Sequence, residues 1–68
     1  MTDRVPFSEV RAGERITFDS GYYMTGTMVR SVGTHRGKRM VHFREDGGDR
    51  ERVISYAAHR SVIRRGDG

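Results

Sequence analysis

The stretch RMVHFREDGGDRERVISY, residues 39–56, has the pattern of two β-strands joined by a tight turn. Apolar and polar side chains alternate on both sides of the central DGGD sequence, and this period of two puts successive side chains on opposite faces of a strand. Glycine and aspartate favour tight turns because they tolerate the backbone angles that such turns require. The stretch therefore predicts a hairpin with strands at 39–45 and 50–56, in which Val41 and Phe43 face the core.

Alternation predicts three further strands, at residues 14–19, 24–32 and 60–64. In the first of them, Ile16 and Phe18 share the inward face, and Thr17 lies on the outward face. A short 3₁₀ turn is expected at 57–59, before the last strand, because this segment is too short for an α-helix. Ser8 is a candidate N-cap for a single helical turn near the start of the chain.

The second of these strands contains Gly26, which marks a bulge or a sharp bend. In a regular strand Met28 and Val32 face inward, whereas a bulge brings in Val29 instead. The polar and basic segment 31–38 follows and contains two glycines. We expect it to form a solvent-facing hairpin tip.

Length and composition describe one small domain with a thin core. The 68 residues are 34% hydrophobic and include no cysteine, so no disulfide compensates for the limited burial. The absence of cysteine suits a reducing cytosol, and no apolar run is long enough for a signal peptide or a membrane span, which predicts a cytoplasmic protein without membrane contact. The predicted organisation is one domain, 1–68, with its folded part at about 10–65 and flexible ends at 1–4 and 66–68.

Four segments occur in an order that is shared by a group of small β-proteins: AGERI at 12–16, GTMV at 26–29, VHFREDG at 41–47 and YAAHRSV at 56–62. Together with the predicted strands, this order resembles the SH3-like barrels, and most of all the small Tudor and KOW type domains. The resemblance implies an all-β fold, a five-stranded SH3-like barrel with a short 3₁₀ turn before the last strand. The chain has no tryptophan, so the aromatic platform of polyproline-binding SH3 domains is missing and polyproline recognition is not expected.

The charge balance is mildly basic and strongly biased toward arginine. Thirteen basic and nine acidic side chains give a formal net charge of +4, and twelve of the thirteen are arginine. The planar guanidinium donates hydrogen bonds in a fork that suits phosphate and carboxylate, so the bias favours a nucleic-acid or an acidic partner. The codon usage of a GC-rich bacterium or phage explains the same bias without any such partner, and both explanations stay open here.

The densest group of cationic residues is THRGKR at 34–39, where neighbouring glycines let the backbone approach a phosphate closely. Candidate contacts with a nucleic-acid backbone are Arg36, Lys38, Arg39, Arg60 and Arg64. A solvated hairpin tip whose charges only aid solubility is the alternative. In the hairpin at 39–56, arginines are interleaved with acidic residues, and we expect cross-strand ion pairs there to interrupt a continuous basic stripe.

Tyr22 and Tyr23 are candidate aromatic contacts. They are adjacent in a predicted loop or strand edge, so one of them points inward and the other outward. The outward tyrosine is suited to stacking on a base or to contacting a protein partner, and the alternative is that both cover the end of the barrel. The resemblance to Tudor domains, which bind methylated side chains in an aromatic cage, adds Phe43 and Tyr56 as candidate cage members.

The sequence contains no catalytic, cofactor or metal-binding pattern. The three histidines are far apart and have no cysteine partners, the serines lack a nucleophile elbow, and no Walker-type loop is present. We also expect no pocket of substrate size, about 300 Å³ or more, in so short a chain. The leading prediction is a non-catalytic module that contacts nucleic acid through arginines; the alternatives are a protein-interaction module, such as a phage-type regulator of a larger host protein, and a homo-oligomer.

Overall fold

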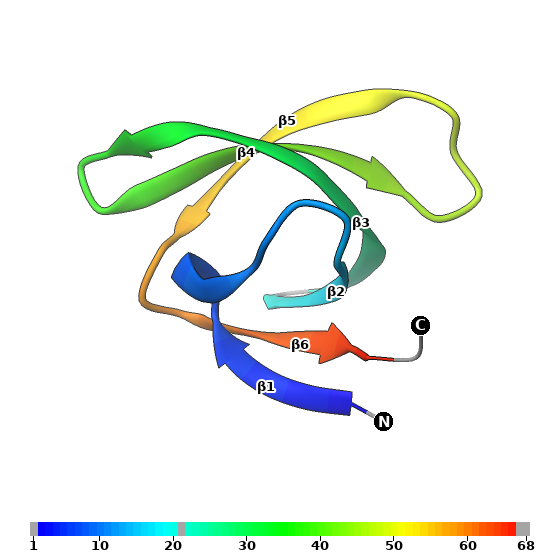
Figure 1. Ribbon diagram of the computed structural model, residues 1–68, viewed down its shortest axis with the longest axis horizontal. Coiled ribbons are helices and arrows are strands. Elements are labelled where there is room, and N and C mark those ends of the chain that lie inside the picture. The colour runs from blue at the N-terminus through cyan, green and yellow to red at the C-terminus, as the bar shows by residue number, and fades with distance from the viewer. Residues whose placement is uncertain (1, 21, 67–68) are drawn as a thin grey trace.

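The computed structural model describes residues 2–20 and 22–66, except for the side chains at 2, 20, 22 and 23, and consists of one antiparallel β-sheet and one 3₁₀ turn (Figure 1). In chain order the elements are β1 (Thr2–Pro6), η1 (Phe7–Glu9), β2 (Arg15–Ser20), β3 (Tyr22–His35), β4 (Lys38–Glu45), β5 (Glu51–Ala57) and β6 (Ser61–Arg65). Their order across the sheet is β1-β6-β2-β3-β4-β5. The prediction of an all-β fold is confirmed.

The sheet is strongly bent, because the 14 residues of β3 pair first with β2 and then with β4. Figure 1 shows the resulting two layers, with β4 and β5 above, β1, β6 and β2 below, and η1 between them. In the described part of the chain, β1 and β5 are the two edges and do not pair with each other. The sheet therefore has six strands and two edges, rather than five strands closed into a barrel.

The additional strand is β1, at a position where the sequence predicted a flexible end over residues 1–4. It pairs with β6, and Val5 lies opposite Val62. Pro6 has no backbone N–H and cannot donate a hydrogen bond to a neighbouring strand. Proline is tolerated at the end of an edge strand, because no such bond is needed there. The prediction failed because this short strand has little alternation and has a proline at its end.

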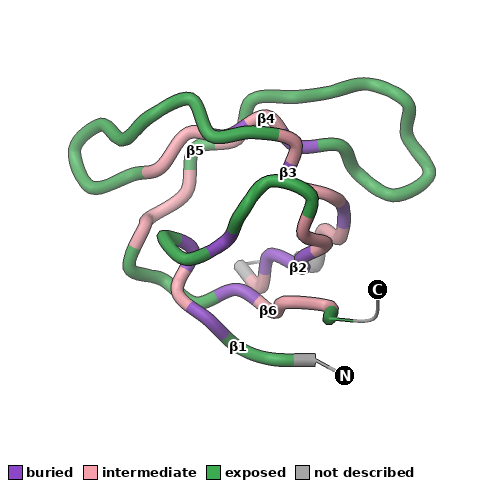
Figure 2. Tube along the Cα trace, in the orientation of Figure 1, coloured by how far each residue is buried: buried purple, intermediate pink, exposed green. Residues whose placement is uncertain are grey.

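Nine apolar side chains are buried and form the core: Val5, Phe7, Val10, Ile16, Phe18, Met28, Val41, Phe43 and Val62. The inward positions predicted for β2 and β4, and for Met28 in β3, are confirmed. Two orientation predictions are wrong, since Val32 is 55% exposed and Thr17 is only 3% exposed. Figure 2 shows that the buried segments line the space between the two layers, whereas both hairpin ends of the upper layer are exposed.

The pairing of β3 with β4 shifts by one residue between Met28 and Arg30, and again between Ser31 and Gly33, where Val32 is the extra residue. The first shift reverses the face on which the following side chains lie, because the period of a strand is two, and so Val32 does not share the inward face of Met28. The strand also continues to His35, so the predicted loop at 31–38 is in fact a strand end and a two-residue turn. Arg36 and Gly37 form this turn with φ angles of 53° and 77°, which is the geometry of a type I′ hairpin.

Gly26 is required for close packing and does not lie at a bulge. It is buried and pairs in register with Ile16 on one side and Glu45 on the other. A Cβ at this position would collide with the carbonyl oxygen of Arg44 and would lie 2.7 Å from Cζ of Phe43. The glycine therefore lets the Phe43 ring lie directly against the β3 backbone.

Directly before the last strand the chain forms a single turn, in which Arg60 N donates to Ala57 O over 3.1 Å, and this is the i→i+3 hydrogen bond that the predicted short 3₁₀ turn requires. A 3₁₀ helix is present at η1, and its N-cap is Pro6 without a side-chain hydrogen bond, so Ser8 is not the cap. Phe7 N donates to Arg60 O over 2.8 Å, and Ser8 N donates to Ala58 O over 2.9 Å. These bonds fix η1 against the β5–β6 turn.

Candidate nucleic-acid interface

Two turns that are distant in sequence meet at one end of the molecule. Ala58 N in the β5–β6 turn donates to Gly37 O in the β3–β4 turn over 2.9 Å. Both turns lie on the left side of the view in Figure 1, whereas the β4–β5 turn lies on the right. Five exposed basic or titratable side chains belong to these turns and are called the basic end here: His35, Arg36, Lys38, His59 and Arg60.

The basic end is built from parts of the chain that contain no acidic residues. Residues 20–44 carry five arginines or lysines and no aspartate or glutamate, and residues 52–66 carry four arginines and no acidic side chain. Within residues 2–20 and 22–66, none of Arg36, Lys38 and Arg60 forms an ion pair. Their positive field is therefore not cancelled locally. The uneven distribution of acidic residues along the chain was the sequence signal that could have indicated this grouping.

The acidic side chains of the large hairpin lie at its opposite end. Glu45 pairs with Arg52 over 3.4 Å, and Glu51 pairs with Nδ1 of His42 over 3.3 Å, each across the β4–β5 ladder. The predicted cross-strand ion pairs are confirmed at these positions. They neutralise the β4–β5 end and leave the basic end as the cationic pole of this hairpin.

Arg60 is oriented by an aromatic ring. Its guanidinium carbon lies 5.7 Å from the ring centroid of Tyr56, a distance at which a cation is attracted to the π-face. Tyr56 in turn packs edge-on against Phe7 and Phe18, with ring centroids 5.5 Å and 4.9 Å apart. The core thus supports the position of an exposed arginine at the basic end.

Arg39 was predicted to contact phosphate, but the structure uses its guanidinium internally. Nη1 donates to the carbonyl oxygens of Phe7 over 2.6 Å and Val10 over 2.7 Å, and Nε donates to Oγ of Ser31 over 3.3 Å. The guanidinium also lies 5.4 Å from the ring centroid of Phe7. Arg39 therefore ties η1 to the sheet beside the basic end.

Arg64 lies on β6, away from the basic end. Its Nε is 3.0 Å from Oε2 of Glu14, and its Nη1 is 3.7 Å from Oδ2 of Asp3. Of the five predicted contact residues, the structure therefore groups Arg36, Lys38 and Arg60. The aromatic candidates Tyr22 and Tyr23 begin β3, and their side chains lie outside the described part of the structure.

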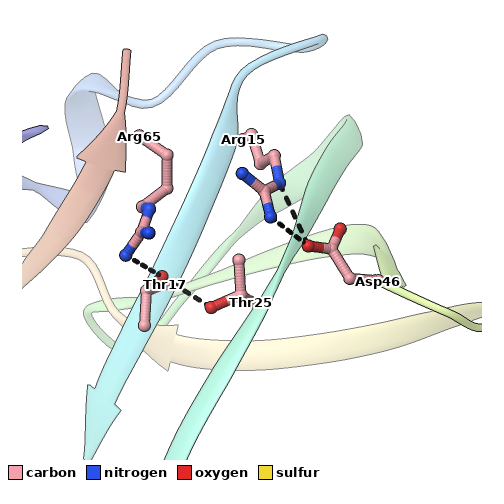
Figure 3. Close-up of polar contacts among 5 residues, drawn as sticks. All are labelled: Arg15, Thr17, Thr25, Asp46 and Arg65. Atoms are coloured by element: carbon pink, nitrogen blue, oxygen red, sulfur yellow. Dashed lines mark hydrogen bonds and ion pairs between the residues drawn. The ribbon is translucent and has the colours of Figure 1, made fainter. Parts of the chain in front are cut away.

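Polar side chains of β2 contact neighbours on β3, on β6 and in the β4–β5 turn (Figure 3). Nε of Arg15 donates to Oδ2 of Asp46 over 3.0 Å, and Nη2 of Arg15 contacts the same oxygen. Buried Thr17 shares a 2.7 Å hydrogen bond with Thr25 and accepts a longer one, 3.5 Å, from Arg65. Thr17 was predicted to face solvent, and these hydroxyl contacts satisfy its polar group at a buried position.

The Arg15–Asp46 contact predicts an acid-dependent loss of stability. The hydrogen bond from Arg15 is the main cause that holds the pKa of Asp46 below its ordinary value of 3.8. Folding therefore favours the ionised carboxylate: this contribution is complete above pH 3.8 and is lost as the pH falls through the lower folded-state value. We expect the stability difference between the wild type and Asp46→Asn in urea unfolding to shrink as the pH falls from about 5 to about 2. A difference that does not change with pH would contradict this role of Asp46.

An open groove lies between the η1 segment, β3 and β6. Its volume is about 860 Å³, so the expectation that the chain has no pocket of substrate size is wrong. Its walls carry the arginines Arg11, Arg30, Arg39 and Arg64, the carboxylates Glu9 and Glu14, and the smaller side chains Ser8, Val10, Ala12, Met28 and Ser31.

Comparisons with protein-family models, with curated proteins and with solved structures found no match to this chain. Over residues 2–20 and 22–66, no helix has the length and apolar character that crossing a membrane requires.

Proposed function

We propose that the protein is a small non-catalytic module of SH3-like type that contacts the backbone of a nucleic acid with its basic end. The observation that carries the proposal is the hydrogen bond between Ala58 N and Gly37 O, which joins two turns from acid-free parts of the chain. It places Arg36, Lys38 and Arg60 on one exposed surface without carboxylate partners in the described chain. Such a surface attracts phosphates and releases their counterions on binding.

The geometry favours backbone contact over base recognition. Arg36 lies in the two-residue turn, Lys38 directly follows it, and both are exposed, so each of them can reach a separate phosphate. A guanidinium held against an aromatic ring, as in Arg60, also offers a planar face on which an unstacked base can lie. The proposal therefore implies weak sequence preference and a strong dependence on salt.

The salt dependence of binding tests this proposal. Fluorescence anisotropy with single- and double-stranded oligonucleotides, measured at several salt concentrations, gives the slope of log K against log salt. Replacing Arg36, Lys38 or Arg60 with glutamine is expected to reduce the slope by about one unit per substitution. The matched control is Arg50→Gln, which removes an exposed arginine at the opposite end of the hairpin. Equal slopes for the wild type and the triple variant, or an equal effect of the control, would refute the basic end as the interface.

A protein partner is a second candidate, because both sheet edges are open. β5 is an edge strand, and its Val53 is 54% exposed. Open edges present unpaired backbone groups to which another strand can be added, in a partner protein or in a second copy of this chain. Concentration-dependent mass in light scattering, or a bound protein that resists nuclease and high salt, would favour this candidate over nucleic-acid binding.

A further inference from the structure

In the upper layer, one face of β4, β5 and the part of β3 that pairs with β4 packs on the core, and the other face is directed away from it (Figure 1). Val41 and Phe43 are buried on the core face, so alternation puts the even-numbered residues of β4 on the other face. Pairing adds residues of β3 and β5 to that face. It is called the outer face here and is defined by Arg30, Lys38, Met40, His42, Arg44 and Val53.

The outer face carries an excess of cationic side chains. Arg30, Lys38 and Arg44 form no ion pair within residues 2–20 and 22–66. Glu51 lies opposite Arg44 on the same face, but its carboxylate is paired with Nδ1 of His42 over 3.3 Å. Three cations therefore accompany one carboxylate that already has a partner, and such a surface attracts a polyanion.

Arg30 is oriented by the side chains of the two neighbouring strands. Its Nη2 lies 3.3 Å from Nε2 of His42, its cross-strand neighbour on β4. His42 is held in turn by Glu51 on β5. A guanidinium that is oriented in this way presents a planar face on which an unstacked base can lie.

Apolar side chains accompany the cations on this layer. Val53 is 54% exposed and pairs with His42, and Met40 is the next outward residue of β4. Met40 is half-buried and is not one of the residues packed on the core. Its partner Gly33 has no side chain, and the preceding Val32 is 55% exposed. Within the described chain, the exposed large hydrophobic residues thus both belong to the strands that flank β4.

Cations and apolar side chains on one open face suit a single nucleic-acid strand. Lysine and arginine bind its phosphates, and its unstacked bases have flat faces that pack against other side chains. In a duplex these flat faces are stacked on one another, and only the base edges and the backbone are accessible. At about 3.4 Å per residue, β4 covers about 20 Å from Lys38 to Arg44, which gives room for several nucleotides.

We propose that the outer face binds single-stranded nucleic acid as a continuation of the basic end. The phosphate backbone follows β4 from Lys38 to Arg44. The bases contact Met40 and Val53 and stack on the guanidinium of Arg30. The proposal rests on the proposed function, because Lys38 belongs to both surfaces, and it adds the class of nucleic acid and the path of the strand.

The affinities of a short oligothymidylate and of its duplex with oligoadenylate, measured by fluorescence anisotropy at several salt concentrations, test this proposal. We expect the single strand to bind more tightly than the duplex. Arg30→Gln and Arg44→Gln are each expected to reduce the salt slope for the single strand by about 0.7 units. The matched control is Arg52→Gln, which removes the same charge from the same hairpin. Arg52 alternates with Val53 and lies on the opposite face, so the control is expected to leave the slope unchanged.

Methyl NMR spectra test the contacts with the bases. A base that packs on a methyl group shifts its resonance through the ring current. We expect oligothymidylate to shift the methyl resonances of Met40 and Val53, whereas inorganic polyphosphate, which has the charge but no bases, leaves them nearly unchanged. The methyl groups of Val41, buried on the core face, are the internal control and are expected to stay unshifted.

Three results would overturn the proposal: a duplex that binds as tightly as the single strand, methyl resonances of Met40 and Val53 that do not move with oligothymidylate, or outer-face variants that bind like Arg52→Gln. Competition by polyglutamate as strong as that by the oligonucleotide would also overturn it and would identify an acidic protein segment as the occupant. If Arg36→Gln and Arg60→Gln lower the salt slope while the outer-face variants do not, this proposal fails and the proposed function stands. If those two variants also bind like the control, the proposed function fails as well.

Discussion

Phe18→Ala is expected to lower the free energy of unfolding by about 3–5 kcal/mol, the usual cost of removing a buried aromatic ring. Phe18 is 3% exposed and lies at the centre of the core. Its ring centroid is 5.3 Å from that of Phe7, 5.1 Å from that of Phe43 and 4.9 Å from that of Tyr56. The substitution removes three edge-on aromatic contacts and leaves a cavity between the two layers of the bent sheet.

Such a loss is comparable with the whole stability of a chain of this size, about 3–10 kcal/mol at the usual 0.05–0.15 kcal/mol per residue. We therefore expect Phe18→Ala to be largely unfolded at room temperature in circular dichroism. Phe18→Leu keeps most of the volume and is expected to remain folded with a lower urea midpoint. The control is Val53→Ala, an exposed apolar residue whose truncation changes stability by about 0.5 kcal/mol or less. Equal midpoints for Phe18→Ala and Val53→Ala would contradict this description of the core.

The sequence predicts those parts of the fold in which one strand face is buried without interruption. Ile16, Phe18, Val41 and Phe43 were assigned correctly, because in β2 and β4 every second residue meets the core. Val32 was not, because nothing in the sequence marks the shift in the β3–β4 pairing between Met28 and Arg30, and only the second shift coincides with a glycine, Gly33. Gly26, the obvious candidate for a bulge, serves close packing against Phe43 instead.

The candidate site was predictable only in those parts that the local sequence determines. Arg36 and Lys38 were identified from local charge alone, and the structure places Arg36 in the exposed β3–β4 turn and Lys38 at the exposed start of β4. The proximity of Arg60 depends on one backbone hydrogen bond between turns about twenty residues apart, which no local pattern encodes. The groove was missed because its lining residues come from four separate segments of the chain, which no local pattern brings together.

Arg39→Met is expected to lower the free energy of unfolding by about 3 kcal/mol, although Arg39 was predicted as a surface contact. The change keeps the apolar stem and removes both hydrogen bonds to the η1 segment, each worth about 1.5–3 kcal/mol for a charged donor. Val10 is 1% exposed, and its carbonyl oxygen, 2.7 Å from Arg39 Nη1, accepts from no other donor among the described residues. That oxygen would be left buried without a donor, which is costly.

Urea unfolding of Arg39→Met, Arg39→Lys and Arg36→Met distinguishes the structural role of Arg39 from a role in binding. Arg36 is exposed in the β3–β4 turn, so Arg36→Met is expected to change stability by about 0.5 kcal/mol or less while reducing the salt slope of nucleic-acid binding by about one unit. Arg39→Lys keeps the charge but replaces the planar fork of donors by one ammonium group, which cannot reach both carbonyl oxygens and the hydroxyl together. This variant is therefore expected to be destabilised as well. The opposite pattern, a fully stable Arg39→Met with a reduced salt slope, would make Arg39 a phosphate contact and would require η1 to be held by other groups.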